Sequence, residues 1–68
     1  MRLSARNQLK GTVTAVKVGT VMSEVTVEVS GQELVAAITR GSVEGLRLTE
    51  GDEVTVVIKA TEVMLAKE

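Results

Sequence analysis

Polar and apolar residues alternate with a period of two along most of this chain, which is the pattern of β-strands with one buried face. The clearest run covers residues 21–29, where four of the five odd-numbered positions are valine and the fifth is Ser23. Its even-numbered positions are Met22 and three polar residues. We therefore predict an antiparallel strand whose valine face lies in the core and whose other face meets solvent.

The same alternation predicts four more strands, at residues 9–18, 33–39, 53–59 and 62–66. Gly19 and Thr20 separate the first two runs, and the sequence Ser-Gly-Gln at residues 30–32 separates the next two. Short connections of this kind contain glycine because glycine adopts the positive φ angles of tight turns. The first three strands are therefore expected to follow one another as hairpins.

Residues 40–48 interrupt the strand pattern, because Val43, Leu46 and Leu48 are spaced as in one short helical turn. Ser42 is a candidate N-cap of that turn. Five short strands with one helical turn before the fourth, in a chain of 68 residues, indicate an all-β fold. We expect a small five-stranded OB-like barrel, formed by a single domain over residues 1–68.

The small size of the chain implies that it needs stabilisation from outside its own core. A domain of this length buries only about 60% of the surface that it exposes when unfolded. The sequence has no cysteine and no histidine, so disulfides and zinc sites built from those residues are excluded. Apolar residues also occupy both faces of the strand expected at residues 53–59. We therefore expect a homo-oligomer in which neighbouring copies cover apolar surface.

Charge and aromatic content argue against nucleic acid as a partner. The chain has no aromatic residue and a formal net charge of −1, so it offers neither base stacking nor an attractive field for a polyanion. No apolar run is long enough to span a bilayer or to form a signal peptide, which indicates a cytoplasmic protein without a membrane partner. Residues 1–23 hold four basic residues and no acidic one. That asymmetry suits a small anion, although chance is the simpler explanation.

Catalysis and cation binding find little support in the sequence. Without histidine, cysteine or tyrosine, acid–base chemistry would depend on carboxylates or lysine, and no motif organises them. The acidic residues stand singly on strands and turns, without the ligand spacing of a calcium loop. We therefore predict that the protein is not an enzyme and has no site for a free metal cation.

Two polar segments are candidates for a binding site. Residues 4–11 gather hydrogen-bond donors ahead of the first strand, and Lys59 places a cation at the end of an apolar strand. A serine hydroxyl, an arginine guanidinium and backbone N–H groups form a donor cluster that suits an oxyanion. The structural alternative is a rim salt bridge for Arg6 and an edge lysine at position 59 that discourages strand pairing.

Three motifs in the same order resemble those of the molbindins, small molybdate-binding proteins that are also called Mop domains. They are Ser-Ala-Arg-Asn-Gln-Leu-Lys-Gly at residues 4–11, Val-Ala-Ala-Ile-Thr at residues 35–39 followed by Ser42, and Val-Ile-Lys-Ala-Thr at residues 57–61 followed by Val63 and Met64. The resemblance covers almost the entire chain. It implies an OB-like barrel that assembles as a homohexamer, built as a trimer of dimers.

The resemblance also implies an oxyanion site shared across a subunit interface. The positions that match it are Ser4, Arg6, Ser42 and Lys59, with backbone N–H groups near Ala60 assisting. A second type of site, near threefold axes, maps loosely to Gly19 and Thr20. Ser4, Arg6, Ser42 and Lys59 would donate hydrogen bonds to a tetrahedral dianion, whose oxygens can only accept them.

The function implied by the resemblance is the binding and the storage or buffering of molybdate, or of tungstate, in the cell. An alternative from another class stays open on the residues alone. It is a protein-interaction barrel module that has no anion ligand. A protein that is monomeric and does not respond to anions would favour this alternative.

Overall fold

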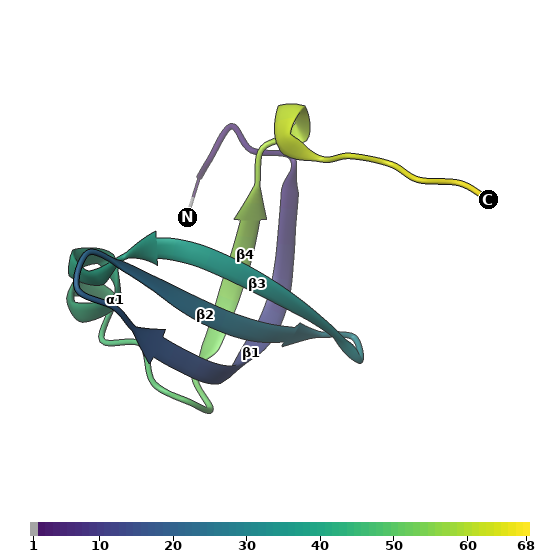
Figure 1. Cartoon of the computed structure of the whole chain (residues 1–68). Coiled ribbons are helices and arrows are strands. Elements are labelled where there is room, and N and C mark those ends of the chain that lie inside the picture. Colours follow the sequence, from purple (N-terminus) through teal and green to yellow (C-terminus); the bar gives the residue numbers. More distant parts are fainter. Residues whose placement is uncertain (1) are drawn as a thin grey trace.

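The computed structural model describes residues 2–68. Its elements in chain order are β1 (Asn7–Val18), β2 (Met22–Val29), β3 (Gln32–Thr39), α1 (Arg40–Leu46), β4 (Glu53–Ile58) and the single 3₁₀ turn η1 (Ala60–Glu62). The four strands form one antiparallel sheet in the order β3-β2-β1-β4 (Figure 1). Four of the five predicted strands and the predicted helical turn are therefore confirmed.

Strand β1 links two differently directed parts of the sheet. Its first half pairs with β4 and its second half pairs with β2, and Thr12 is the residue that pairs with both Glu53 and Glu28. An irregularity in the register follows directly, between Val13 and Ala15, which is the place where a bulge bends a strand. The bend is visible in Figure 1, where β1 turns from the β2 side toward β4.

Gly11 allows the close packing on the inner side of this bend. A Cβ atom at that position would lie 2.6 Å from Val27 Cγ1 and 2.7 Å from the carbonyl oxygen of Glu28. Such distances are shorter than carbon atoms tolerate, so no other residue fits without displacing β2.

The core consists of valines contributed by β1, β2 and α1. Val13, Val25, Val27 and Val43 are buried, and seven partly buried residues pack around them: Val16, Val29, Ala36, Ile38, Leu48, Val54 and Val56. The predicted inward face of residues 21–29 is confirmed for the central positions of that run, because Ser23 is buried together with Val25 and Val27. The prediction is wrong for Val21, which is 71% exposed because it lies in the turn before β2. The hydroxyl of Ser23 is satisfied inside the core, where it accepts a hydrogen bond from the backbone N–H of Gly19 at 3.3 Å.

The N-cap of α1 is Thr39, not Ser42, which corrects the sequence-based expectation. Thr39 is the last residue of β3 and has an extended backbone (φ −69°, ψ 152°), and its hydroxyl oxygen accepts a hydrogen bond from the N–H of Ser42. Both residues are good capping types, so the choice depends on where β3 ends rather than on local preference.

Between residues 2 and 68, no helix has the length and apolar character that crossing a membrane requires.

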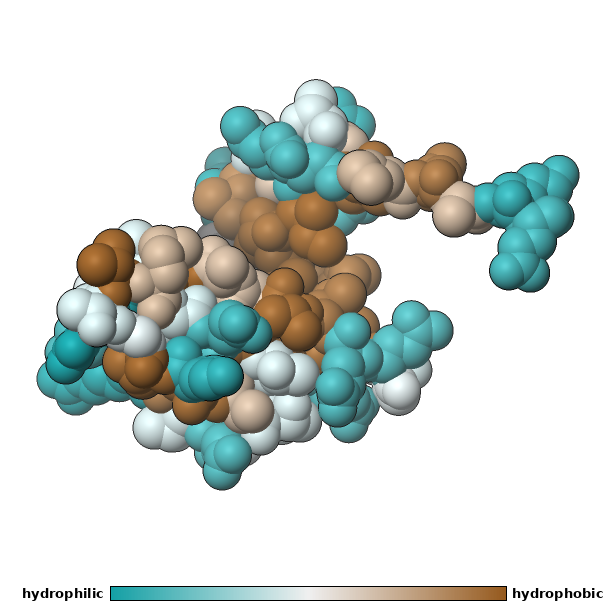
Figure 2. Space-filling view, in the orientation of Figure 1, coloured by the Kyte–Doolittle hydropathy of each residue, from teal (hydrophilic) through white to brown (hydrophobic). Residues whose placement is uncertain are grey.

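The fifth strand expected at residues 62–66 does not form in the single chain. The chain turns after β4 because the N–H groups of Glu62 and Val63 bond back to the carbonyl oxygens of Lys59 and Ala60. Residues 63–68 then continue without helix or strand, and the tail points away from the sheet (Figures 1 and 2). Met64 and Leu65 are 89% and 95% exposed. The barrel therefore stays open in the chain as described, with four strands.

The β2–β3 hairpin offers a prediction about stability. Its two loop residues, Ser30 and Gly31, both have positive φ (50° and 82°), as a type I′ turn requires. Serine tolerates this conformation less well than asparagine. We expect Ser30→Asn to raise the free energy of unfolding by roughly 0.5–1 kcal/mol, measured by thermal or urea denaturation. A lower stability than that of the wild type would contradict the turn assignment.

Candidate functional site

The segment before β1 and the segment after β4 lie side by side, although more than fifty residues separate them in sequence. Asn7 pairs with Ile58 at the end of the ladder, and the side-chain amide of Asn7 donates to the carbonyl oxygen of Ile58 at 3.2 Å. This pairing brings together the residues that line a hollow of about 310 Å³: Ser4, Ala5, Arg6, Lys59, Ala60 and Thr61. Four of the predicted site residues thus come from both ends of the chain to one place.

The hollow offers hydrogen-bond donors and positive charge. Arg6 and Lys59 are among the residues that line it, and none of the lining residues carries a carboxylate. Within residues 2–68 the ion pair formed is that between Arg40 and Glu44, so no carboxylate pairs there with Arg6 or Lys59. Two cations beside a serine hydroxyl match the chemistry of a small oxyanion.

Backbone N–H groups add to this donor set. In the 3₁₀ turn that follows β4, Glu62 and Val63 donate to the carbonyl oxygens of Lys59 and Ala60. The N–H groups of Ala60 and Thr61 take no part in the hydrogen bonds found among residues 2–68. Ala60 and Thr61 stand next to Lys59 among the residues that line the hollow.

The hollow is open to solvent. Ser4, Arg6, Lys59 and Ala60 are all exposed, and only Ala5 is half-buried. Charge-assisted hydrogen bonds are weaker when water competes for both partners. An anion held in this hollow by one chain alone would therefore remain partly hydrated.

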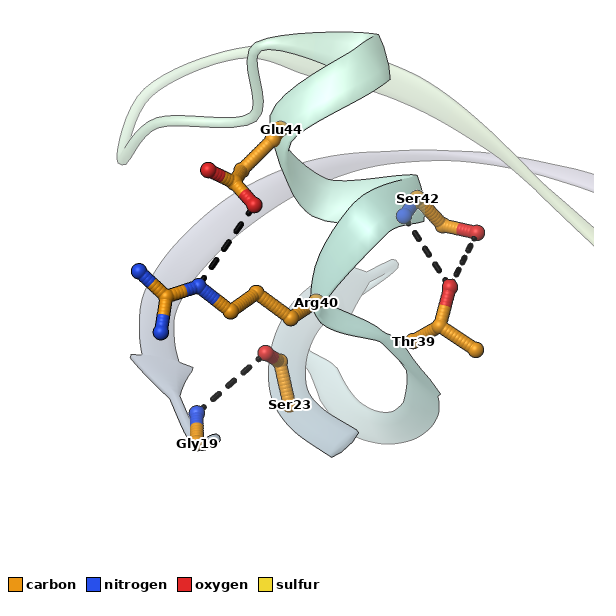
Figure 3. A network of polar contacts seen from close by, with 6 residues as sticks. All are labelled: Gly19, Ser23, Thr39, Arg40, Ser42 and Glu44. Carbon is orange, nitrogen blue, oxygen red and sulfur yellow. Dashed lines mark hydrogen bonds and ion pairs between the residues drawn. The ribbon is translucent and has the colours of Figure 1, made fainter. Parts of the chain in front are cut away.

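Ser42 does not line this hollow. It lies on α1, which contacts β2 and β3, whereas the hollow is built at the ends of β1 and β4. Its hydroxyl oxygen is 2.8 Å from the hydroxyl oxygen of Thr39 (Figure 3). Of the predicted site residues, Ser42 is thus the one that the single chain places apart from the other candidates for the oxyanion.

The loosely mapped second site lies at the turn between β1 and β2. Gly19 belongs to a hollow of about 330 Å³ whose lining also includes Lys17, Ser23 and Glu24, but not Thr20. The carboxylate of Glu24 opposes an anion, and the N–H of Gly19 is already donated to Ser23. In one chain this turn has fewer free donors than the hollow at Arg6 and Lys59.

Another hollow, of about 430 Å³, is different in character. Its lining combines Lys10 with the carboxylates of Glu28 and Glu53 and with hydroxyl groups of Thr12, Ser30 and Thr55. Two carboxylates disfavour a dianion. This hollow is therefore not a candidate for the oxyanion.

Thr61 and Thr39 are functional candidates that sequence reasoning did not select. Thr61 lines the hollow beside Lys59 and Ala60, and its place directly after them in the third motif was the available signal. The hydroxyl oxygen of Thr39 accepts a hydrogen bond from the N–H of Ser42 and lies within hydrogen-bond distance of the hydroxyl oxygen of Ser42. The sequence offered less reason to select Thr39, since a threonine at the end of a predicted strand is common.

Comparison with known proteins places the chain in a family. Residues 3–65 match the TOBE domain family. The chain is 52% identical over 66 residues to molybdenum-pterin-binding protein 3 of Clostridium pasteurianum, covering 96% of this chain and 97% of that protein.

Solved structures agree with this match. A molybdate-binding protein from Sporomusa ovata superposes with a TM-score of 0.95 at 48% identity, over 98% of this chain and all of that one. The cytoplasmic molybdate-binding protein ModG, with molybdate bound, superposes with a TM-score of 0.84 at 46% identity, over 88% of this chain and 43% of that one. The chain therefore belongs to the TOBE domain family and, within it, to the molybdenum-pterin-binding proteins, the molbindins that its motifs resemble.

Proposed function

We propose that this protein binds molybdate, or tungstate, in the hollow formed by Ser4, Arg6, Lys59 and Ala60. The observation that carries the proposal is the donor set itself: the residues that line one hollow carry two cations without a carboxylate partner, a hydroxyl group and two N–H groups that form no hydrogen bond within residues 2–68. Close relatives named for molybdate or for molybdenum-pterin binding support the choice of ligand.

Each member of the donor set has a distinct part in holding the ligand. Molybdate is a tetrahedral dianion whose oxygens only accept hydrogen bonds. The planar guanidinium of Arg6 donates two parallel N–H bonds, and the ammonium of Lys59 neutralises charge without fixing direction. The hydroxyl of Ser4 and the N–H groups at Ala60 and Thr61 satisfy the remaining oxygens.

The site is completed by a second copy of the chain in this proposal. Ser42 lies on α1, away from the hollow, and the hollow is open on one side. A neighbouring copy that places its own Ser42 over the opening adds a donor and excludes water, which strengthens every charge-assisted bond. The residue that the single chain sets apart then belongs to the site of the assembly.

Apolar surface supports assembly. The chain exposes large apolar side chains on its strands, on α1, on the tail, in the segment before β1 and in the turn before β2: Leu3, Leu9, Val18, Val21, Met22, Val35, Leu46, Val57, Val63, Met64 and Leu65. A single copy of this size leaves such surface in water at a cost in stability. We propose a homohexamer, built as a trimer of dimers, in which the tail of one copy adds the fifth strand of a closed barrel to another.

The cellular role that we propose is the storage or buffering of molybdate in the cytoplasm, by a single domain over residues 1–68. No chemical step is assigned to the site. Histidine, cysteine and tyrosine, the side chains that most often transfer protons or attack substrates near neutral pH, are absent from the sequence.

Titration calorimetry with a panel of oxyanions tests the proposed function. We expect tight binding of molybdate and tungstate, weaker binding of sulfate and much weaker binding of hydrogen phosphate. A donor-only site leaves the proton of hydrogen phosphate without an acceptor, which costs about 1–3 kcal/mol. Equal affinity for molybdate and hydrogen phosphate would contradict the donor-only site, and no binding of any oxyanion would favour a protein-interaction module.

Native mass spectrometry at micromolar concentration tests the assembly. We expect a hexamer as the dominant species, because the exposed apolar residues of one chain need a partner surface. Removal of residues 63–68 should shift the distribution toward smaller species. A spectrum dominated by monomer would contradict both the assembly and a site shared between copies.

A further inference from the structure

Asn7 and Gln8 belong to the first sequence motif but have no part in the proposed donor set. They begin strand β1, directly after residues 4–6, which line the hollow. The side-chain amide of Asn7 donates to the carbonyl oxygen of Ile58 at 3.2 Å, and that of Gln8 donates to the carbonyl oxygen of Ala5 at 3.0 Å. A backbone carbonyl only accepts hydrogen bonds, so the amide nitrogen is the donor in both cases. Both amides are therefore committed to the backbone around the hollow.

The segment that carries Ser4 and Arg6 depends on these amides for its conformation. It precedes β1, and it takes no part in the backbone–backbone hydrogen bonds found among residues 2–68 outside the helices and strands. The chain bends within it, at Ser4 and at Arg6. The hydrogen bond found for this segment among residues 2–68 is the one that Gln8 donates to Ala5. Without that bond, the segment would keep backbone freedom that ligand binding has to remove.

The two amide bonds hold the chain on both sides of Arg6. Gln8 fixes Ala5, the residue before it, and Asn7, the residue after it, is fixed to the end of β4. The bond of Asn7 is partly buried and joins residues 51 positions apart in sequence. Figure 1 shows the start of β1 beside the end of β4, where this bond forms. The backbone of Arg6 is therefore held in place relative to Lys59, the residue that follows β4.

We propose that Asn7 and Gln8 are positioning residues of the oxyanion site, whose amides fix the direction in which Arg6 presents its guanidinium to the ligand. The proposal rests on the proposed function, in which Arg6 and Lys59 bind molybdate. A planar guanidinium forms two parallel bonds only when it approaches the anion in the right plane, whereas an ammonium needs no fixed direction. Holding it in that plane before binding raises affinity, because less freedom is then lost on binding.

Neutral amides suit this task for an electrostatic reason. A carboxylate at either position could not donate to a carbonyl oxygen and would repel a dianion nearby. A lysine could donate, but its charge would attract the anion away from Arg6. Asparagine and glutamine fix the backbone and leave the charge of the site to Arg6 and Lys59.

The advantage of arginine over lysine at position 6 measures this orientation. It is the ratio between the molybdate dissociation constants of a protein with Arg6→Lys and of the same protein without it, determined by calorimetry on the assembled protein. A substitution that only unfolds part of the sample or weakens binding in general changes both constants together and leaves the ratio unchanged. In the wild type we expect a ratio above one, because Arg6→Lys loses the parallel pair of donors.

Gln8→Met and Asn7→Leu remove the amides and keep side chains of similar size. We expect each to weaken molybdate binding by roughly three- to tenfold, as the loss of one hydrogen bond implies. The ratio should fall toward one by a similar factor, because a lysine at position 6 has no planar pair of donors to misdirect. Gln8 is exposed, so Gln8→Met should leave the melting temperature of the ligand-free protein nearly unchanged. It therefore covers the case in which Asn7→Leu, at a half-buried position, does not fold.

Gln32→Met is the matched control for Gln8→Met. Gln32 is exposed at the start of β3 and is not among the residues that line the hollow. The same chemical change there should leave both the molybdate affinity and the ratio at their wild-type values.

Two results would overturn the proposal while the proposed function stands. One is a wild-type ratio in both Gln8→Met and Asn7→Leu, because the amides would then act independently of Arg6. The other is equal molybdate affinity in Arg6→Lys and the wild type, because Arg6 would then need no fixed direction. The proposed function stands in both cases if the wild type binds molybdate and Lys59→Ala weakens that binding. Absence of molybdate binding by the wild type would overturn both, so the two failures are distinguishable.

Discussion

Arg6→Ala and Lys59→Ala are each expected to weaken molybdate binding by about 2–3 kcal/mol, which is a loss of roughly 30- to 150-fold in affinity. Each variant removes one of the two cations that line the hollow, and the other cation is left to neutralise a dianion. Calorimetric titration with molybdate measures the loss. Thermal melts give an independent readout, because ligand at about 100 times its dissociation constant stabilises the wild type by about 2.7 kcal/mol, an increment the variants should lose at the same concentration.

Two further variants make this experiment specific. Arg6→Lys keeps the charge but removes the planar pair of donors, so an intermediate loss of affinity is expected. Lys10→Ala removes an equal charge from β1 at a position outside the hollow and should change molybdate affinity little. If Arg6→Ala and Lys59→Ala bind molybdate as tightly as Lys10→Ala does, then Arg6 and Lys59 are ordinary surface charges and the site assignment is wrong.

Gly11→Ala is expected to destabilise the fold more than any other conservative change discussed for the sheet. The added methyl group would lie within 2.8 Å of three atoms of β2, and one of them is the backbone carbonyl oxygen of Glu28, which cannot rotate away. Overpacking of this kind costs about 1–3 kcal/mol. In a domain of this size we expect a melting temperature lower by roughly 5 °C or more, measured by circular dichroism.

Gly45→Ala is the matched control for the same chemical change. Gly45 lies within α1, and a Cβ atom there would meet nothing within 4 Å apart from its chain neighbours and the backbone of its own helix. Alanine in a helix interior is more favourable than glycine by about 0.5–1 kcal/mol, so this variant should be as stable as the wild type or more stable. An equal loss of stability in Gly11→Ala and Gly45→Ala would argue against the close approach of β1 and β2.

The resemblance of the motifs located the candidate site more effectively than the physical pattern did. Period-two alternation places Lys59 at the end of a strand but does not say what lies opposite, because strand register is not encoded in one strand. The pairing of Asn7 with Ile58 supplies that information and brings Arg6 beside Lys59. Thr61 joins the lining for the same reason, since it follows Lys59 and Ala60 around the 3₁₀ turn.

The errors about the N-cap of α1 and about the fifth strand share one cause: in each case the local sequence favoured two outcomes equally. Thr39 and Ser42 are both capping residues, and the pairing of Thr39 with Met22 decided where the strand ends and the helix begins. Polar and apolar residues alternate only weakly over residues 62–66, so the local sequence permits a strand there but does not require one. The 3₁₀ bonds of Glu62 and Val63 turn the tail away from the sheet, so within one chain it finds no strand to pair with.

The sequence by itself determined which residues face the core, because side chains in a strand alternate between two faces whatever the strand pairs with. That rule is local, and it correctly placed Val25 and Val27 inside. Only the tertiary structure decided which donors meet, because the meeting of Ser4 and Arg6 with Lys59 depends on contacts between the two ends of the chain. It also decided that Ser42 stands apart, held by Thr39 on a helix that packs against other strands.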